Sequence, residues 1–162
     1  MVMVRLRFTE QSSRREQILV RVLLAHGPNL SQLGTRDPTV YGTATLADIV
    51  SIVAAEVDEV DDFVTEYEGA LVERLHAARR DGTEAVILNP GALTHYSYAL
   101  HDAVELLSMP VIEVHLSQTA AREPFRHHSV VSPVVDATIT GAGPFGYHLA
   151  AQAAAHLAAG RR

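Results

Sequence analysis

The chain has no cysteine and no lysine, and all 13 of its basic residues are arginine. Without cysteine the protein has no disulfide framework, no zinc site with thiolate ligands and no cysteine nucleophile. Without lysine it forms no Schiff base with a carbonyl substrate or with pyridoxal phosphate, and it has no P-loop lysine. Any catalysis must therefore proceed without a thiol and without a side-chain amine.

Long apolar runs and excess positive charge are missing as well. No stretch of about 18 apolar residues occurs, so the sequence predicts no membrane-spanning segment. With 19 acidic residues against 13 basic ones the formal net charge is −6, which disfavours nucleic acid as a partner. The apolar stretch within residues 1–17 is too short for a signal peptide, and we expect these residues to be a flexible extension or a vector-derived leader. We interpret the chain as a cytoplasmic protein.

What the chain does have is an alternation of strand-like and helix-like segments. Short apolar runs that end in turns predict strands at 18–25, 84–88, 111–114 and 137–140, with a weaker strand signal within 58–65. Helical periodicity predicts helices that begin after Thr45, with Asp48 completing the cap, and at 69–80, 94–107 and 144–159, with one further turn at 121–126. This order predicts one α/β domain over residues 18–160, with a flavodoxin-like, doubly wound sheet of about five parallel strands and helices on both faces.

Polar residues follow three of the predicted strands. Ligands of an open α/β sheet bind at the carboxyl ends of its strands, so these residues are the candidate site residues. They are Asn29, Arg36 and Tyr41 after the first strand, Asn89, His95 and Asp102 after the strand at 84–88, and His115, Ser117, Arg122 and Arg126 after the strand at 111–114. We expect the three groups to meet at one rim of the sheet.

Two other motifs have simpler interpretations than a ligand site. His127 and His128 have no further histidine or carboxylate at metal-ligand spacing, so they predict an exposed pair and no metal site. The glycines at 141 and 143 lack the following strand and acidic residue of a dinucleotide-binding loop, so they predict a turn.

The glycine- and proline-rich loop after the first strand carries both Arg36 and Tyr41. A free tyrosine, with a pKa of about 10, is a poor base at neutral pH. A nearby guanidinium favours the phenolate and lowers that pKa, and arginine keeps its own proton. A loop of this kind can also close over a substrate and exclude water. A tyrosine base on a lid is therefore a hypothesis, which these two residues alone do not establish.

Three blocks of the sequence, in this order, resemble the signatures of the type II 3-dehydroquinate dehydratases. They are Gly27-Pro28-Asn29-Leu30 with Leu33-Gly34, Arg36-Asp37-Pro38 and Tyr41-Gly42; Leu88-Asn89-Pro90-Gly91-Ala92 with Thr94-His95, Ser97 and Asp102; and Ile112-Glu113-Val114-His115 with Ser117, Arg122-Glu123, Phe125-Arg126-His127-His128-Ser129 and Ser132-Pro133. The similarity extends over roughly residues 18–157 and includes Gly146-Tyr147. It implies a flavodoxin-like fold and the dehydration of 3-dehydroquinate to 3-dehydroshikimate through an enolate, with no metal and no cofactor.

The same resemblance implies a role for each candidate residue. Tyr41 would remove the C2 proton, Arg36 would hold Tyr41 as the phenolate, and Asn29 would stabilise the enolate. His115 would protonate the departing C1 hydroxyl, with Glu113 orienting its ring. The remaining assignments are Arg122 as a supporting residue and Asn89, His95, Asp102, Leu116, Ser117 and Arg126 as substrate-binding residues.

The resemblance also implies that the chain assembles as trimers that form a dodecamer, with Asp102 reaching a site across a subunit boundary. Two departures stand out: His26 replaces the usual Asn before Gly-Pro-Asn, and Val64-Thr65-Glu66 replaces the usual Gln-Ser-Asn. They leave open the same chemistry on an amino analogue of dehydroquinate, with Glu66 as the discriminating residue. A non-catalytic oligomeric member of the family is a further alternative.

Overall fold

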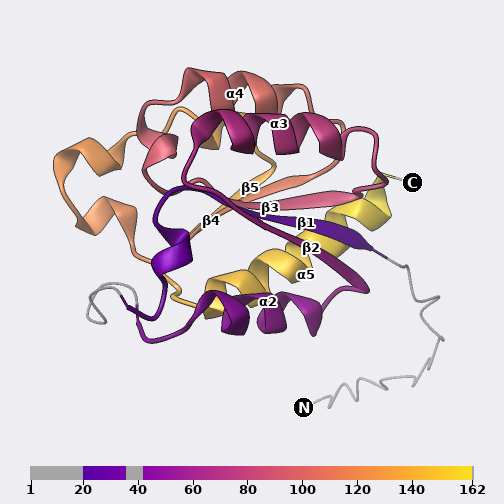
Figure 1. Ribbon diagram of the computed structural model, residues 1–162, viewed down its shortest axis with the longest axis horizontal. Helices are drawn as coiled ribbons and strands as arrows, with labels where there is room; N and C mark the ends of the chain where they lie inside the picture. The colour runs from indigo at the N-terminus through magenta and orange to yellow at the C-terminus, as the bar shows by residue number, and fades with distance from the viewer. Residues whose placement is uncertain (1–19, 36–41, 162) are drawn as a thin grey trace, which may run out of the picture.

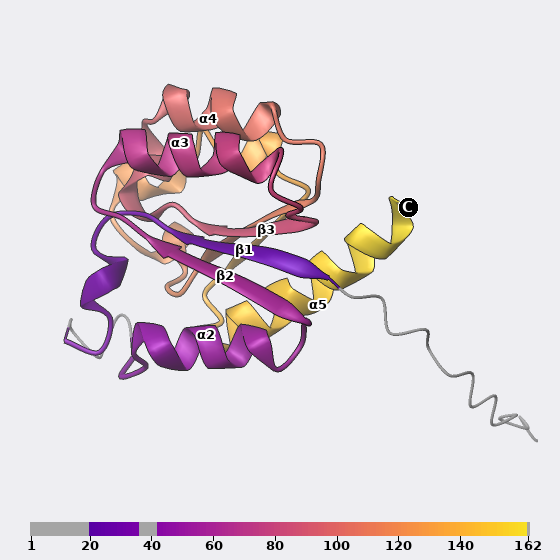
Figure 2. The ribbon, with the colours of Figure 1, turned by 45° about the vertical axis from the view of Figure 1, so that its right-hand side comes forward.

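The computed structural model describes residues 20–35 and 42–161 of the chain. Its middle layer is a five-stranded sheet in the order β2-β1-β3-β4-β5, and every pairing is parallel (Figure 1). Helices α3 and α4 cover one face, and α2 and α5 cover the other (Figure 2). The predicted flavodoxin-like α/β architecture is therefore confirmed. None of the helices in the described part of the chain is both long and apolar enough to cross a membrane.

The strands differ in how they are buried. Their bounds are β1 (Arg21–His26), β2 (Glu59–Val64), β3 (Ala85–Asn89), β4 (Val111–His115) and β5 (Ala137–Thr140). β3 and β4 are buried along their whole length and β1 along all but its first residue, as near-continuous apolar runs of a parallel sheet require. β2 is an edge strand, which is why it tolerates the acidic residues that make its sequence signal weak.

The four helices of the described chain supply the outer layers. They are α2 (Leu46–Ala54), α3 (Glu68–Ala78), α4 (Tyr98–Glu105) and α5 (Phe145–Gly160). The predicted cap of α2 is confirmed, because Thr45 and Asp48 form a reciprocal capping box. One apolar cluster lies under α2 and α5 and includes Ile49, Ile87 and Tyr147, and the other, under α3 and α4, is centred on residues such as Leu71 and Leu100.

Two of the predicted helical segments need correction. The chain from 94 to 107 is not one helix: a 3₁₀ helix spans Gly91–His95, and Ser97 then caps α4 by accepting the Leu100 N–H at 2.9 Å. The expected turn at 121–126 is two 3₁₀ helices, Thr119–Ala121 and Pro124–His127, because Pro124 begins a new turn. The first correction moves His95 from α4 to the end of the 3₁₀ helix that follows β3.

The loops that follow β1 and β3 touch backbone to backbone. The Gly27 N–H donates to the Asn89 carbonyl at 2.8 Å, and a Cβ at Gly27 would lie 2.6 Å from the Pro90 oxygen. Gly91 has a φ of +59°, and a Cβ there would lie 2.9 Å from the Pro28 oxygen. Glycine is required at both positions. β1 pairs with β2 on one side and β3 on the other, so these loops lie at the switch point of the sheet, where such folds bind ligands.

Candidate active site

A pocket of about 120 Å³ opens at the carboxyl ends of β1, β3 and β4. The predicted site residues that line it are Asn29, Asn89, His95, His115, Leu116, Ser117, Arg122 and Arg126. The three stretches singled out in the sequence therefore do meet at one rim. Arg36 and Tyr41 lie outside the described residues.

The most buried charged group beside the pocket is Glu113. Its side chain is fully buried, and Oε1 accepts a hydrogen bond from His115 Nε2 at 2.7 Å. The hydroxyls of Thr94 and Ser132 donate to Oε1 and Oε2 respectively. Burial opposes ionisation of this carboxyl, but the bonds from His115, Ser132 and Thr94 outweigh it and hold the pKa of Glu113 below its ordinary value.

Glu113 in turn fixes the ring of His115. Residues two apart on a strand share a face, so β4 presents both side chains in the same direction. An ionised carboxylate only accepts hydrogen bonds, so Nε2 of His115 carries the proton in this pair. Nδ1 is then the ring nitrogen available to a ligand. The hydroxyls of Thr94 and Ser132 had no assigned role in the sequence, although both stand in the motif blocks.

The ring of His95 is held through Nδ1, whereas that of His115 is held through Nε2. Nδ1 of His95 lies 2.7 Å from the His128 carbonyl oxygen, which only accepts, so Nδ1 carries the proton. The ring stands edge-on to Phe125 with the ring centres 5.9 Å apart. Burial, together with the nearby charge of Arg126, lowers the pKa of His95 despite the bond to His128. The ring is therefore neutral at neutral pH, and Nε2 can accept a hydrogen bond from a ligand hydroxyl.

Tyr147, to which the sequence analysis assigned no role, orients the side chain of Asn89. Its Nδ2 donates to the hydroxyl of Tyr147 at 2.8 Å, and its Oδ1 accepts the Gly91 N–H at 3.2 Å. Tyr147 is completely buried, and burial raises the pKa of its phenol, so it remains neutral. The only sequence signal for this contact was the Gly146-Tyr147 pair in the last motif.

Arginine side chains give the rim a positive charge. Arg122 donates from Nη1 to Ser117 Oγ at 3.0 Å, and Arg126 donates from Nε to Glu123 Oε2 at 2.8 Å. The guanidinium carbon of Arg126 also lies 4.7 Å from the centre of the Phe125 ring. These contacts fix two guanidinium groups at the pocket, so the site suits an anionic ligand although the whole chain carries a net charge of −6.

Asn29 has an unusual backbone conformation. Its φ of 69° makes it the one residue other than glycine with a positive φ among residues 20–35 and 42–161. Its backbone N–H donates to Glu66 Oε2 at 2.7 Å. A strained residue held in place by its neighbours is typical of a functional site, and Asn29 is one of the residues that line the pocket.

Neither of the two sequence departures lies on the pocket lining: His26 is buried beneath it, whereas Glu66 is exposed. His26 is fully buried, its ring tilts against Tyr147 with the ring centres 5.6 Å apart, and its Nδ1 lies 3.5 Å from the Asp62 carboxylate. Both oxygens of Glu66 are engaged by the loop after β1.

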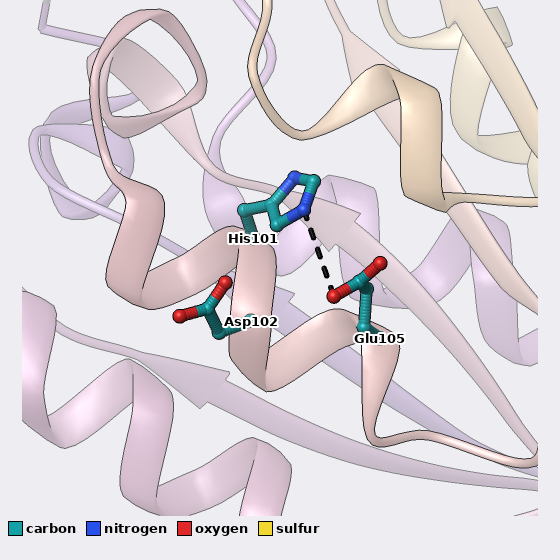
Figure 3. A group of neighbouring side chains, drawn as sticks. All are labelled: His101, Asp102 and Glu105. Atoms are coloured by element: carbon teal, nitrogen blue, oxygen red, sulfur yellow. Dashed lines mark ion pairs between the residues drawn. The ribbon is translucent and has the colours of Figure 1, made fainter.

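Asp102 is the one described candidate that this single chain does not bring to the pocket. It is exposed on α4, and its expected role across a subunit boundary stays a prediction. With His101 and Glu105 it forms a group whose ligand atoms lie within 4.8 Å of one another (Figure 3). His101 Nε2 is 3.7 Å from Glu105 Oε2, and Nδ1 is 2.7 Å from the Val130 carbonyl. We interpret the group as a surface ion pair between positions i and i+4 with an exposed aspartate beside it.

Comparison with known proteins decides the family. The family model described as "Dehydroquinase class II" matches residues 20–155 of the chain. The chain belongs to the class II dehydroquinase family. This dehydroquinase is 48% identical over 140 residues to the "3-dehydroquinate dehydratase" of Methylococcus capsulatus, with 84% of this chain and 95% of that one covered. It is 46% identical over 138 residues to the "Catabolic 3-dehydroquinase" of Botryotinia fuckeliana, with 82% and 90% covered.

Solved structures support the same family assignment. The crystal structure of the type II dehydroquinase from Propionibacterium acnes is similar with a TM-score of 0.77 and 42% identity, covering 86% of this chain and 96% of that one. The type II dehydroquinase from Butyrivibrio crossotus is similar with a TM-score of 0.78 and 38% identity, covering 82% and 94%. The family predicted from the three motif blocks is therefore confirmed.

Proposed function

We propose that this dehydroquinase removes water from 3-dehydroquinate to give 3-dehydroshikimate and needs no cofactor to do so. The observation that carries the proposal is the buried pair of Glu113 and His115, which holds the ring through Nε2 and leaves Nδ1 available in a pocket with an arginine rim. When the ring is protonated on both nitrogens, Nδ1 is the nitrogen that can give a proton to the substrate. The names of the curated relatives support the same substrate and reaction. Hydro-lyase chemistry of this kind needs a base, an anion-stabilising group and an acid, and the chain has a candidate for each.

In the proposed reaction the phenolate of Tyr41 takes the C2 proton, and the electron pair of that bond forms an enolate with the C3 carbonyl. The amide of Asn29 stabilises the enolate oxygen, as preorganised donors do. The electron pair then returns to form the C1–C2 double bond as the C1 hydroxyl departs. His115 gives that hydroxyl a proton, so water leaves, and the net change is the loss of one water molecule. Arg36 keeps Tyr41 ionised at neutral pH.

The substrate's other polar groups match the described pocket. Nε2 of His95 accepts a hydrogen bond from a ring hydroxyl, because Nδ1 is committed to His128. The substrate carboxylate fits the rim of the pocket, which is lined there by Leu116, Ser117 and Arg126. Asn89, held by Tyr147, has spare hydrogen-bonding capacity for a hydroxyl. These contacts bind the substrate in one orientation, which is what the elimination requires.

The alternative substrate, an amino analogue of dehydroquinate, was suggested by the acidic Glu66. A carboxylate facing the pocket would favour an amino substituent, but Glu66 is bound to Asn29 and Ser31 and lies outside the lining. His26 is buried and does not line the pocket either. These positions favour 3-dehydroquinate over an amino analogue. A non-catalytic role is disfavoured because a scaffold has no need of a buried carboxylate held by two hydroxyls and a histidine.

We also propose that the enzyme acts in the cytoplasm as a homo-oligomer, with trimers assembled into a dodecamer. Exposed apolar side chains lie at both ends of α4, the helix that carries Asp102: Tyr96, just before it, is 61% exposed, Tyr98, its first residue, 71%, and Leu106, just after it, 50%. A contact between copies that covers these residues would bring Asp102 to a neighbouring subunit. Size-exclusion chromatography with light scattering tests this, and a monomeric mass would contradict it.

The test of the reaction is a direct assay. Purified protein is mixed with 3-dehydroquinate and a chelator, no cofactor is added, and the absorbance of the conjugated product is followed. We expect turnover in the wild type and its loss in the Tyr41→Phe and His115→Ala variants. His156→Ala, at an exposed position on α5, is the matched control and should keep full activity. A flat trace from folded wild-type protein would contradict the proposed substrate.

A further inference from the structure

Glu66 joins the end of β2 to the loop after β1. Its Oε2 accepts the backbone N–H of Asn29 at 2.7 Å, and its Oε1 accepts the hydroxyl of Ser31 at 2.5 Å. The residue before it is tied to β1 as well, because the Thr65 N–H donates to the His26 carbonyl at 3.0 Å. The carboxylate, two residues beyond the end of β2, therefore contacts the loop at two points.

These two bonds are shorter than the backbone bonds within the loop. Those run from 3.1 Å, between the Leu33 N–H and the Leu30 oxygen, to 3.4 Å, between the Leu30 N–H and the Gly27 oxygen. Bonds to an ionised acceptor are shorter and stronger than bonds between neutral groups. The bond from the Ser31 hydroxyl, followed by that from the Asn29 N–H, also keeps the pKa of Glu66 below its ordinary value, so both oxygens stay acceptors at neutral pH.

Asn29 needs such support. Its φ of 69° and ψ of 1° place it in the left-handed region, which costs free energy for a residue with a Cβ atom. The direction of its side chain follows from that backbone conformation. If the residue relaxed to an ordinary conformation, the amide would leave the pocket lining that it now shares with His115.

We propose that Glu66 is a positioning residue of the active site, whose carboxylate holds Asn29 in the left-handed conformation and so directs the Asn29 amide at the reacting oxygen of the substrate. This inference rests on the proposed role of Asn29 in stabilising the enolate. Glu66 does not line the pocket and acts through Asn29 without touching the substrate. A Gln at this position could still accept the Asn29 N–H and could donate to the Ser31 hydroxyl, but it lacks the negative charge that strengthens both bonds.

The kinetic test separates a positioning role from a general structural one. We expect Glu66→Ala to lower kcat by about 10- to 100-fold with little change in KM, because an interaction made only with the developing charge affects kcat. Glu66→Gln should fall between this variant and the wild type. Glu73→Ala, an exposed glutamate on α3, is the matched control and should leave both constants unchanged.

A double-mutant cycle decides whether the effect passes through Asn29. Asn29→Gly removes the amide but retains a residue that adopts positive φ freely. If Glu66 acts by directing the amide, adding Glu66→Ala to Asn29→Gly should lower kcat no further. An equal loss in both backgrounds would overturn the proposal, as would a rise in KM with kcat unchanged, which would place Glu66 in contact with the substrate.

A second measurement does not depend on turnover. Hydrogen exchange followed by mass spectrometry over residues 27–33 reports how firmly the loop is held. We expect faster exchange in Glu66→Ala than in the wild type and no change in Glu73→Ala. Unchanged exchange in Glu66→Ala would overturn the proposal. If the wild type fails to convert 3-dehydroquinate while the exchange difference is present, the proposed substrate is wrong and the loop is nevertheless held by Glu66.

Discussion

His115 Nε2 lies 2.7 Å from Glu113 Oε1, and the carboxylate it contacts is completely buried. Three donors, two of them hydroxyls, surround this one carboxylate. A buried charge is costly unless it is paired and hydrogen-bonded, and here both conditions are met. The pair therefore fixes both the ionisation of Glu113 and the position of the proton on His115.

Replacing Glu113 by Gln tests this control of the proton. The amide keeps the size of the side chain but carries no negative charge. His115 gives a proton from Nδ1 only when its ring is protonated on both nitrogens, and the amide no longer offsets the charge of that ring. We expect kcat to fall by at least about 100-fold, as happens when a histidine loses the carboxylate that sets its tautomer. Steady-state kinetics with Glu73→Gln as the control measure the effect, and wild-type kcat in Glu113→Gln would contradict it.

The lowered pKa of Glu113 predicts a dependence of stability on pH. Its folded pKa lies below the ordinary value of 4.5, so the unfolded chain binds a proton more readily. The stabilisation is fully present above pH 4.5 and is lost as the pH falls through the folded pKa. Chemical unfolding at pH 7 and at pH 4, at one protein concentration, should show a smaller pH effect for Glu113→Gln than for the wild type. Identical pH effects would contradict the assignment.

Tyr147→Phe removes the hydroxyl that accepts from Asn89 Nδ2. A buried amide donor is left without its partner, which costs about 1–3 kcal/mol of unfolding free energy. Because the Asn89 side chain loses its support, we also expect KM to rise several-fold. Denaturant unfolding and steady-state kinetics measure the two effects. Tyr67→Phe is the control, since Tyr67 is 77% exposed, and a comparable loss there would argue against the explanation.

Gly27→Ala tests the contact between the loops after β1 and β3. The new Cβ would lie 2.6 Å from the Pro90 oxygen, which is backbone and cannot swing away. We expect a loss of about 1–3 kcal/mol of unfolding free energy, together with lower kcat, because the loops that carry Asn29 and Asn89 must separate. Gly69→Ala is the matched control, since a Cβ there meets nothing within 4 Å. Calorimetry and activity assays should separate the two variants.

The sequence predicted the fold because its strongest signals are local. The apolar runs of the central strands and the capping box at Thr45 and Asp48 each depend on neighbouring residues, and the structure confirms them. The helix predicted at 94–107 was wrong because apolar spacing alone does not reveal that Ser97 starts a new helix. Periodicity measures which side chains are buried and says little about where a short helix begins.

The site was predictable as far as the motif blocks reach. Eight of the candidate residues in these blocks line one pocket, because the carboxyl ends of parallel strands lie at the same edge of the sheet. The supporting contacts were not predictable: Tyr147 and Asn89 are 58 positions apart, and Glu66 and Asn29 are 37 apart. Such contacts are set by how helices and loops pack on the sheet. No pattern of neighbouring residues encodes them.

The position of Glu113 and His115 on a single buried strand has one more consequence. β4 is held in register by β3 on one side and β5 on the other. A slip of one residue would turn both side chains toward the opposite layer of helices at the same moment. The acid and its carboxylate are thus present together or absent together. The specific activity after refolding should therefore be proportional to the fraction of molecules whose sheet has the native register. No population of molecules with partial activity is expected.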